Sequence, residues 1–154
     1  MGDAFEFELP VEDGPEAYYG AGFLADLIAR RKAGASTADL VDLLCLADLN
    51  PILDDPSRHR PYYVQLLTAD ETTIQGTGEG ARIYDRFNEQ VLAEILVGSS
   101  IEANPEAHLL LRTAFAMNAH GVLIECLKGE DPGLLLQVSR RLRRALLDQV
   151  MNGS

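Results

Sequence analysis

Twelve consecutive residues without a formal charge, TAFAMNAHGVLI at 113–124, constrain the fold of this chain more than any other feature. In a helix that contains this stretch and the residues just before it, large apolar side chains fall on every side. They are Leu109, Leu110, Leu111, Phe115, Met117, Val122 and Leu123. A helix that is apolar all round must be surrounded by its own domain or by a partner subunit. Gly121 points the same way, because a mid-helix glycine costs about 1 kcal/mol and is tolerated where another backbone comes close.

Cap and turn signals divide the rest of the chain into helices, which predicts an all-α fold of about six helices with bundle or orthogonal packing. Asn104-Pro105 and Asp131-Pro132 each combine a capping side chain with a proline at the first helical position. Pro51 lacks a backbone donor and is expected to end or kink its helix. The predicted helices span residues 15–32, 36–50, 61–69, 81–97, 105–128 and 132–151.

The segments between and before these helices complete the expected organisation. DETTIQGTGEG at 70–80 predicts a loop, because three glycines in five positions oppose a helix. AFEFELPV at 4–11 alternates like a strand but has no partner strand. We therefore expect an acidic extended tail or arm over 1–15 and one helical domain over 16–151.

The charge of the chain is unevenly distributed. Its formal net charge is -11 over 154 residues, and the first sixteen residues contain six acidic residues and no basic one. This balance opposes direct nucleic-acid binding, which needs a basic surface. Arg140 to Arg144, RRLRR, is the one dense basic cluster, interpreted as a solvated helix face; docking of the acidic tail there is an alternative. The N-terminus does not resemble a signal peptide and no apolar run is long enough for a membrane, so we expect a cytoplasmic protein.

The last predicted helix is amphipathic and pairs naturally with the uncharged helix before it. A three-residue turn between two long helices predicts an antiparallel hairpin, suited to a four-helix contact with a second copy. We therefore expect a homodimer. Its predicted interface residues are Ala114, Gly121, Leu135, Val138, Leu142 and Leu146.

The order of these helices resembles the C-terminal domain of the TetR family of bacterial transcriptional regulators. The similarity covers residues 16–150 and follows FLADLIARRKAGAS, STADLVDLLCLADLNPILDDP, RPYYVQLL, ARIYDRFNEQVLAEIL, NPEAHLLLRTAFAMNAHGVLIECLKGEDP and LLLQVSRRLRRALLDQV. The resemblance implies a ligand-sensing domain whose last two helices form the dimer. The family's N-terminal helix-turn-helix has no counterpart before Pro15, so the chain is either a fragment or a relative without a DNA-binding half.

The resemblance also implies a ligand pocket among the first five helices. Its candidate residues are Tyr62, Tyr63, Tyr84, Asn88, Phe115, Asn118 and His120. Asn118 and His120 are polar groups in the uncharged stretch 113–124 of this helix, so each must find a partner. They either bind a ligand in an apolar cavity or hydrogen-bond a facing helix.

Three functions remain open at this point. The leading one is a TetR-like regulatory domain that binds a small apolar effector, uses no cofactor and does not itself bind DNA. The second is an interaction or antirepressor protein without a ligand, acting by heterodimerisation with a full-length regulator or by DNA mimicry. The third is a small helical enzyme, for which neither a nucleophile motif nor metal-ligand spacing of His59, His108 and His120 gives support.

Overall fold

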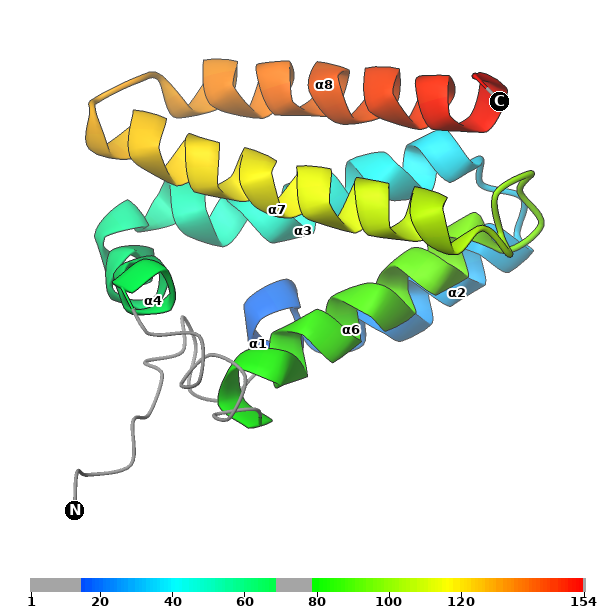
Figure 1. The fold of residues 1–154 in the computed structure, drawn as a ribbon, viewed down its shortest axis with the longest axis horizontal. Coiled ribbons are helices and arrows are strands. Elements are labelled where there is room, and N and C mark those ends of the chain that lie inside the picture. Colours follow the sequence, from blue (N-terminus) through cyan, green and yellow to red (C-terminus); the bar gives the residue numbers. More distant parts are fainter. Residues whose placement is uncertain (1–14, 69–78, 154) are drawn as a thin grey trace.

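The computed structural model describes residues 15–68 and 79–153, and all regular structure in these residues is α-helical (Figure 1). The predicted all-α class is therefore confirmed. Residues 1–14 of the predicted arm and 70–78 of the predicted loop lie outside the described residues. The helices are α1 (Pro15–Tyr19), α2 (Phe23–Lys32), α3 (Thr37–Asp54), α4 (Pro56–Thr68), α6 (Glu79–Leu96), α7 (Pro105–Leu127) and α8 (Pro132–Asn152).

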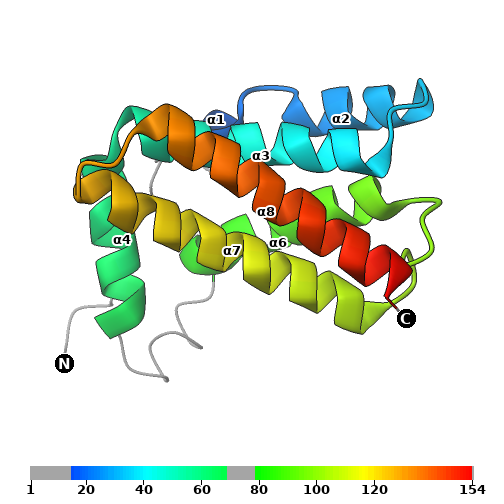
Figure 2. The same ribbon diagram turned by 90° about the horizontal axis from the view of Figure 1, so that it is seen from above.

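The helix α3 lies at the centre and contacts each of the other described helices. α7 and α8 run antiparallel, side by side, and lie in front of the other helices when the molecule is seen from above (Figure 2). α2 and α6 pack together on the other side of α3, and α4 packs against α7. The last two helices therefore form a hairpin along one side of the molecule.

Three long helices begin with a capping side chain, and those at Asn104 and Asp131 are the two predicted above. Oγ of Ser36 accepts a hydrogen bond from the Asp39 amide at 3.1 Å at the start of α3. At α7, Oδ1 of Asn104 accepts from the Ala107 amide at 3.2 Å, and at α8, Oδ2 of Asp131 accepts from the Leu134 amide at 2.9 Å. These side chains satisfy donors that the first turn of a helix leaves without intrahelical partners. The predicted bounds of α7 and α8 are accordingly correct to one residue.

The single helix predicted over 15–32 is wrong, because the chain forms two helices there. Gly20 and Gly22 adopt φ of 98° and 77°, in the left-handed region that glycine enters without steric cost. The helix therefore stops after Tyr19 and restarts at Phe23. This break sets α1 apart as a short segment packed on α3 and α6.

The helix boundaries predicted at two prolines, an end before Pro51 and a start at Pro61, are also wrong. α3 continues through Pro51 to Asp54, and the side chain of Ile52 in this last turn is fully buried. Since only one backbone donor is lost, near the helix end, this burial holds the final turn in place. α4 begins at Pro56 rather than at Pro61, directly after Asp55, which repeats the Asx-Pro signal that opens α7 and α8.

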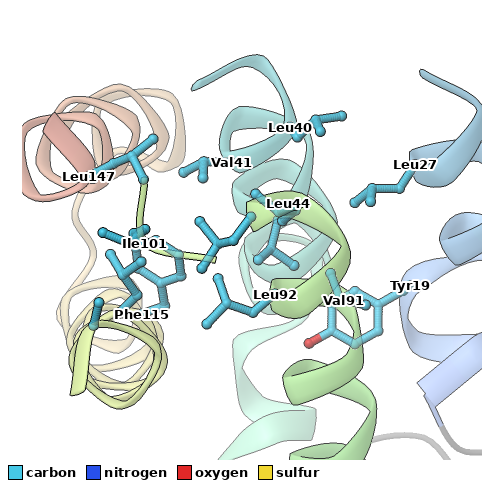
Figure 3. Close-up of a cluster of buried hydrophobic side chains, with 14 residues drawn as sticks. Tyr19, Leu27, Leu40, Val41, Leu44, Val91, Leu92, Ile101, Phe115 and Leu147 are labelled. Carbon is cyan, nitrogen blue, oxygen red and sulfur yellow. The ribbon is translucent and has the colours of Figure 1, made fainter. Parts of the chain in front are cut away.

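The core consists of two clusters of buried apolar side chains that share α3 and α7. The larger cluster joins α2, α3, α6, α7 and α8 through residues such as Leu27, Leu44, Val91, Leu111 and Leu147 (Figure 3). The smaller cluster joins the second halves of α3 and α7; its buried members are Cys45, Leu49, Ile52, Ala119, Val122 and Leu123. Cys45 and Cys126 are free thiols. Among the described helices none is both long and apolar enough to cross a membrane.

The face that α8 turns to the core is not the apolar face seen in the sequence. Its buried residues are Ser139, Arg143 and Leu147, whereas Val138 and Leu142 are each 53% exposed. α7 also keeps an exposed apolar side, with Met117 67% exposed. The hairpin therefore uses a partly polar face for its own core and leaves apolar side chains outside.

Candidate functional site

A cavity of about 210 Å³ lies among α1, α3, α4, α6 and α7. All five tyrosines of the chain line it: Tyr18 and Tyr19 from α1, Tyr62 and Tyr63 from α4, and Tyr84 from α6. α7 adds Phe115 and His120, and α3 adds Leu44 and Asp48. The cavity therefore touches both core clusters and has a wall that is largely aromatic.

Six of the seven predicted ligand-binding residues lie in the wall of this one cavity. They are Tyr62, Tyr63, Tyr84, Asn88, Phe115 and His120. Asn118 is not part of the wall. Its Nδ2 donates to Oγ of Ser139 at 3.0 Å, and its Oδ1 accepts from Nε of Arg143 at 2.8 Å. Asn118 thus follows the structural alternative, in which the side chain bonds a facing helix.

The polar centre of the site is an ion pair that the sequence did not reveal. Nη2 of Arg143 donates to Oδ2 of Asp48 at 2.7 Å, and the Arg143 side chain is 1% exposed. The guanidinium also lies over the Phe115 ring, 4.7 Å from its centre. A buried charge of this kind needs a partner and further hydrogen bonds. Arg143 therefore ties α8 to α3 and α7 behind the cavity wall.

Asp48 also anchors the two tyrosines of α1. The hydroxyl of Tyr18 donates to the Asp48 carbonyl at 2.8 Å. The hydroxyl of Tyr19 lies 2.7 Å from Oδ1 of Asn88 and 3.1 Å from Oδ1 of Asp48. Burial, and next the Asp48 carboxylate, raise the pKa of both phenols well above the usual value of 10.0. Both hydroxyls therefore remain neutral donors near pH 7.

His120 is the one histidine in the cavity wall. Its ring packs against Tyr63 with 4.3 Å between centroids and a steep angle of 70°. Burial lowers the pKa of His120 below 6.5, although the Asp48 carboxylate opposes this shift. The imidazole is therefore mostly neutral at physiological pH and can accept or donate a hydrogen bond without adding charge.

The described residues contain no cluster of three or more His, Cys, Asp or Glu side chains that could hold a metal ion. Three glutamates form separate local contacts: Glu94 pairs with Arg31, Glu102 accepts from the Gly98 amide, and Glu125 pairs with Lys128.

The predicted dimer residues lie on or beside an exposed apolar strip of the hairpin. Gly121, Val138 and Leu142 are exposed, while Ala114, Leu135 and Leu146 are half-buried. The strip, named here the hairpin face, comprises Leu110, Ala114, Met117, Gly121 and Ile124 of α7 with Leu134, Val138 and Leu142 of α8. The spacing of three to four residues on each helix is that of a helix-packing seam.

The interpretation of RRLRR as a solvated face holds for Arg140, Arg141 and Arg144, which are exposed, and is wrong for Arg143. Arg143 is buried in the site described above. Arg140 and Arg144 both donate to the carboxylate of Asp42 on α3. Burial alone would raise the pKa of Asp42, but the hydrogen bonds from these arginines outweigh burial and hold it below 3.8. The cluster therefore fastens α8 to α3.

No protein-family model matches the chain, and neither the curated proteins nor the solved structures give a match.

Proposed function

We propose that this chain is a TetR-like regulatory domain that forms a homodimer through α7 and α8 and binds a small, mostly apolar molecule in the tyrosine-lined cavity. The observation that carries the proposal is that α7 contributes residues both to the cavity wall and to the hairpin face. One side of this helix lines the cavity with Phe115, Ala119 and His120, and the other side carries the exposed Met117 and Ile124. A ligand that moves α7 would therefore also move the hairpin face.

The hairpin face supports the dimer because it exposes more apolar side chains than a solvated helix pair needs. Met117 is 67% exposed, and Leu110, Ile124, Leu134, Val138 and Leu142 are each exposed by about half. Contiguous exposed apolar surface of this kind marks an interaction site. A second copy can cover it by the same hairpin, which gives a two-fold symmetric four-helix contact.

The buried polar network supports communication between the two regions. Arg143 belongs to α8, yet its ion pair with Asp48 lies directly behind the cavity, where Asp48 also holds Tyr18 and Tyr19. A ligand that displaces either tyrosine would change the hydrogen bonds of Asp48, and through Arg143 the position of α8. Coupling between the two regions requires that this network adopt a second arrangement when the ligand is bound.

The dimer is tested with Met117→Glu and Leu142→Glu, alone and combined. We expect the parent chain to sediment as a dimer and the double variant as a folded monomer, because two carboxylates cannot be buried unpaired in an apolar contact. Leu67→Glu on α4 is the control, since Leu67 is 77% exposed and is not part of the hairpin face. A monomeric parent chain would rule out this interface.

The ligand proposal is tested by a thermal-shift screen with small apolar and aromatic compounds. Binding to the folded state raises the unfolding temperature by mass action. Hits should lose their effect in His120→Leu and Phe115→Ala, which alter the cavity, and keep it in Leu67→Ala. A solved structure in which side chains fill the cavity would refute this part of the proposal.

A further inference from the structure

The arrangement of the five tyrosines gives the cavity the form of an aromatic enclosure. Tyr18 and Tyr84 meet at 5.9 Å and 85°, Tyr62 and Tyr63 at 5.3 Å and 70°, and Tyr62 and Tyr84 at 6.5 Å and 49°. Rings inclined to one another in this way form adjoining walls instead of a flat stack. The three helices α1, α4 and α6 thus contribute walls to one space.

The two α1 rings in this enclosure are held by their hydroxyl groups. Tyr18 and Tyr19 both reach Asp48 through hydrogen bonds. An aromatic ring fixed in this way loses little further conformational freedom when a ligand binds. The part of the wall that α1 contributes is therefore preorganised for ligand binding.

The ionised residues of the wall give an anion no free partner. The basic residue among the lining residues, Arg112, forms an ion pair with Glu89 at 2.7 Å. Asp48 is likewise paired with Arg143 at 2.7 Å, although its side chain keeps 18% exposure. The tyrosine rings are therefore the main recognition elements that the wall offers to a charged ligand.

We propose that the cavity binds an organic cation, a tertiary or quaternary ammonium on an apolar body, with the tyrosine rings and Asp48 as its recognition elements. Tyrosine rings attract cations through the negative face of the ring, and an enclosure of several rings is the typical site for quaternary ammonium groups. The inference rests on the proposed function and narrows the class of its ligand. The apolar body would contact Leu44, Leu92 and Phe115 in the same wall.

Arg143 offers the opposite possibility, an anion site. Its Nη1 is buried and has no hydrogen-bond partner among the described residues. However, the Arg143 side chain is 1% exposed and is not part of the cavity wall. Asp48 and Phe115, which do line the cavity, both contact its guanidinium. An anion would have to displace Asp48 to reach it.

The deciding experiment compares three probes of similar shape: benzyltrimethylammonium, its neutral carbon isostere neopentylbenzene, and the anion benzylsulfonate. The chain has no tryptophan, and its five tyrosines all line the cavity, so intrinsic tyrosine fluorescence reports on this site alone. Calorimetry provides the affinities. We expect the cation to bind about tenfold more tightly than its neutral isostere, and the sulfonate not to bind.

Variants of Tyr62 then locate the effect. Tyr62→Leu should weaken binding of the cation about fivefold or more and change that of neopentylbenzene much less, whereas Tyr62→Phe, which keeps the ring, should bind the cation more tightly than Tyr62→Leu. Leu67→Ala is the control outside the cavity. If Tyr62→Leu does not fold, the comparison of probes on the unmodified chain still decides.

The outcomes separate the two proposals. Equal binding of the cation and the neutral isostere would overturn the cation inference and leave the proposed apolar effector site in place. Preference for benzylsulfonate would overturn the inference in favour of Arg143 as an anion site. Failure of all three probes to bind would count against both this inference and the proposed ligand-binding function.

Discussion

At the scale of single residues, Arg143 is a buried charged side chain that connects three helices. Its guanidinium is held by Asp48, by Asn118 and, at 3.4 Å, by the Phe115 carbonyl. Each of these groups lies on a different turn of α3 or α7. Because charge can be buried only with such partners, the positions of α3, α7 and α8 depend on one another through this side chain.

We predict that Arg143→Met destabilises the chain by about 3 kcal/mol, because the variant leaves the Asp48 carboxylate without its charged partner in a poorly solvated place. Arg141→Ala, on the exposed side of the same helix, should change stability little. Urea unfolding followed by circular dichroism measures both. The double variant Arg143→Met with Asp48→Leu should recover much of the loss, since it removes the unpaired charge as well. Equal stability of the parent and Arg143→Met would contradict the assigned role.

The buried histidines predict how stability depends on pH. Burial lowers the pKa of His59, with Arg58 adding to the effect and the Pro51 carbonyl opposing it, and burial lowers the pKa of His120 as well. Below pH 6.5 the unfolded chain therefore binds protons more readily than the folded one. The free energy of unfolding should fall as pH decreases through 6.5 toward the folded pKa values, and should become flat about one pH unit above 6.5.

The measurement is urea unfolding at several values between about pH 7.5 and pH 5. We expect the double variant His59→Gln with His120→Gln to show a shallower loss over this interval, whatever its stability at neutral pH. A slope unchanged from that of the parent would mean that these two histidines do not control the acid sensitivity. Asp42, whose pKa is lowered, adds a separate loss only below about pH 4.

At the scale of helices, local signals determined some boundaries and tertiary packing determined others. The caps at Asn104 and Asp131 are readable because side chain and backbone donor are three residues apart. The continuation of α3 past Pro51 cannot be predicted from local sequence, since it depends on the packing of Ile52 between helices. The prediction placed α4 at Pro61 because it overlooked Asp55-Pro56, a signal that the sequence does contain.

The same division applies to the candidate site. Adjacent tyrosines at 62–63, with Phe115 and His120 in the uncharged helix, could be singled out because aromatic and polar groups are conspicuous in their local context. The pair of Asp48 and Arg143 is 95 residues apart in the chain and lacks any local pattern. Tyr18 and Tyr19 were missed for a related reason, as the break at Gly20 and Gly22 was not foreseen.

We predict that Asp131→Ala destabilises the hairpin by about 1 kcal/mol, because the first turn of α8 then loses the acceptor for the Leu134 amide. Asp131→Asn should retain most of the stability, since asparagine caps equally well. Hydrogen exchange of the amides in the first turn of α8 provides the local readout, and thermal unfolding the global one. If Asp131→Ala and Asp131→Asn behave alike, capping is not what holds this turn.

At the scale of the whole molecule, the hairpin of α7 and α8 is both part of the core and an uncovered surface. One side of α7 supplies Leu111, Phe115, Ala119 and Val122 to the core clusters, while the other side exposes Leu110, Met117 and Ile124. α7 is apolar all round because both its core-facing side and its exposed side carry apolar residues. A single subunit covers only the core-facing side, and we propose that a second copy covers the exposed side.

Gly121 makes this assignment testable with one methyl group. It is exposed in the middle of α7, and a Cβ added there would meet nothing within 4 Å in the subunit. Gly121→Ala should therefore stabilise the separate subunit by about 1 kcal/mol through helix propensity. In the dimer the partner's backbone is expected to come close at this position, so the same methyl should weaken association. Unfolding at low protein concentration measures the gain, and sedimentation equilibrium measures the loss. A variant that is more stable and associates as tightly as the parent would place Gly121 outside the interface.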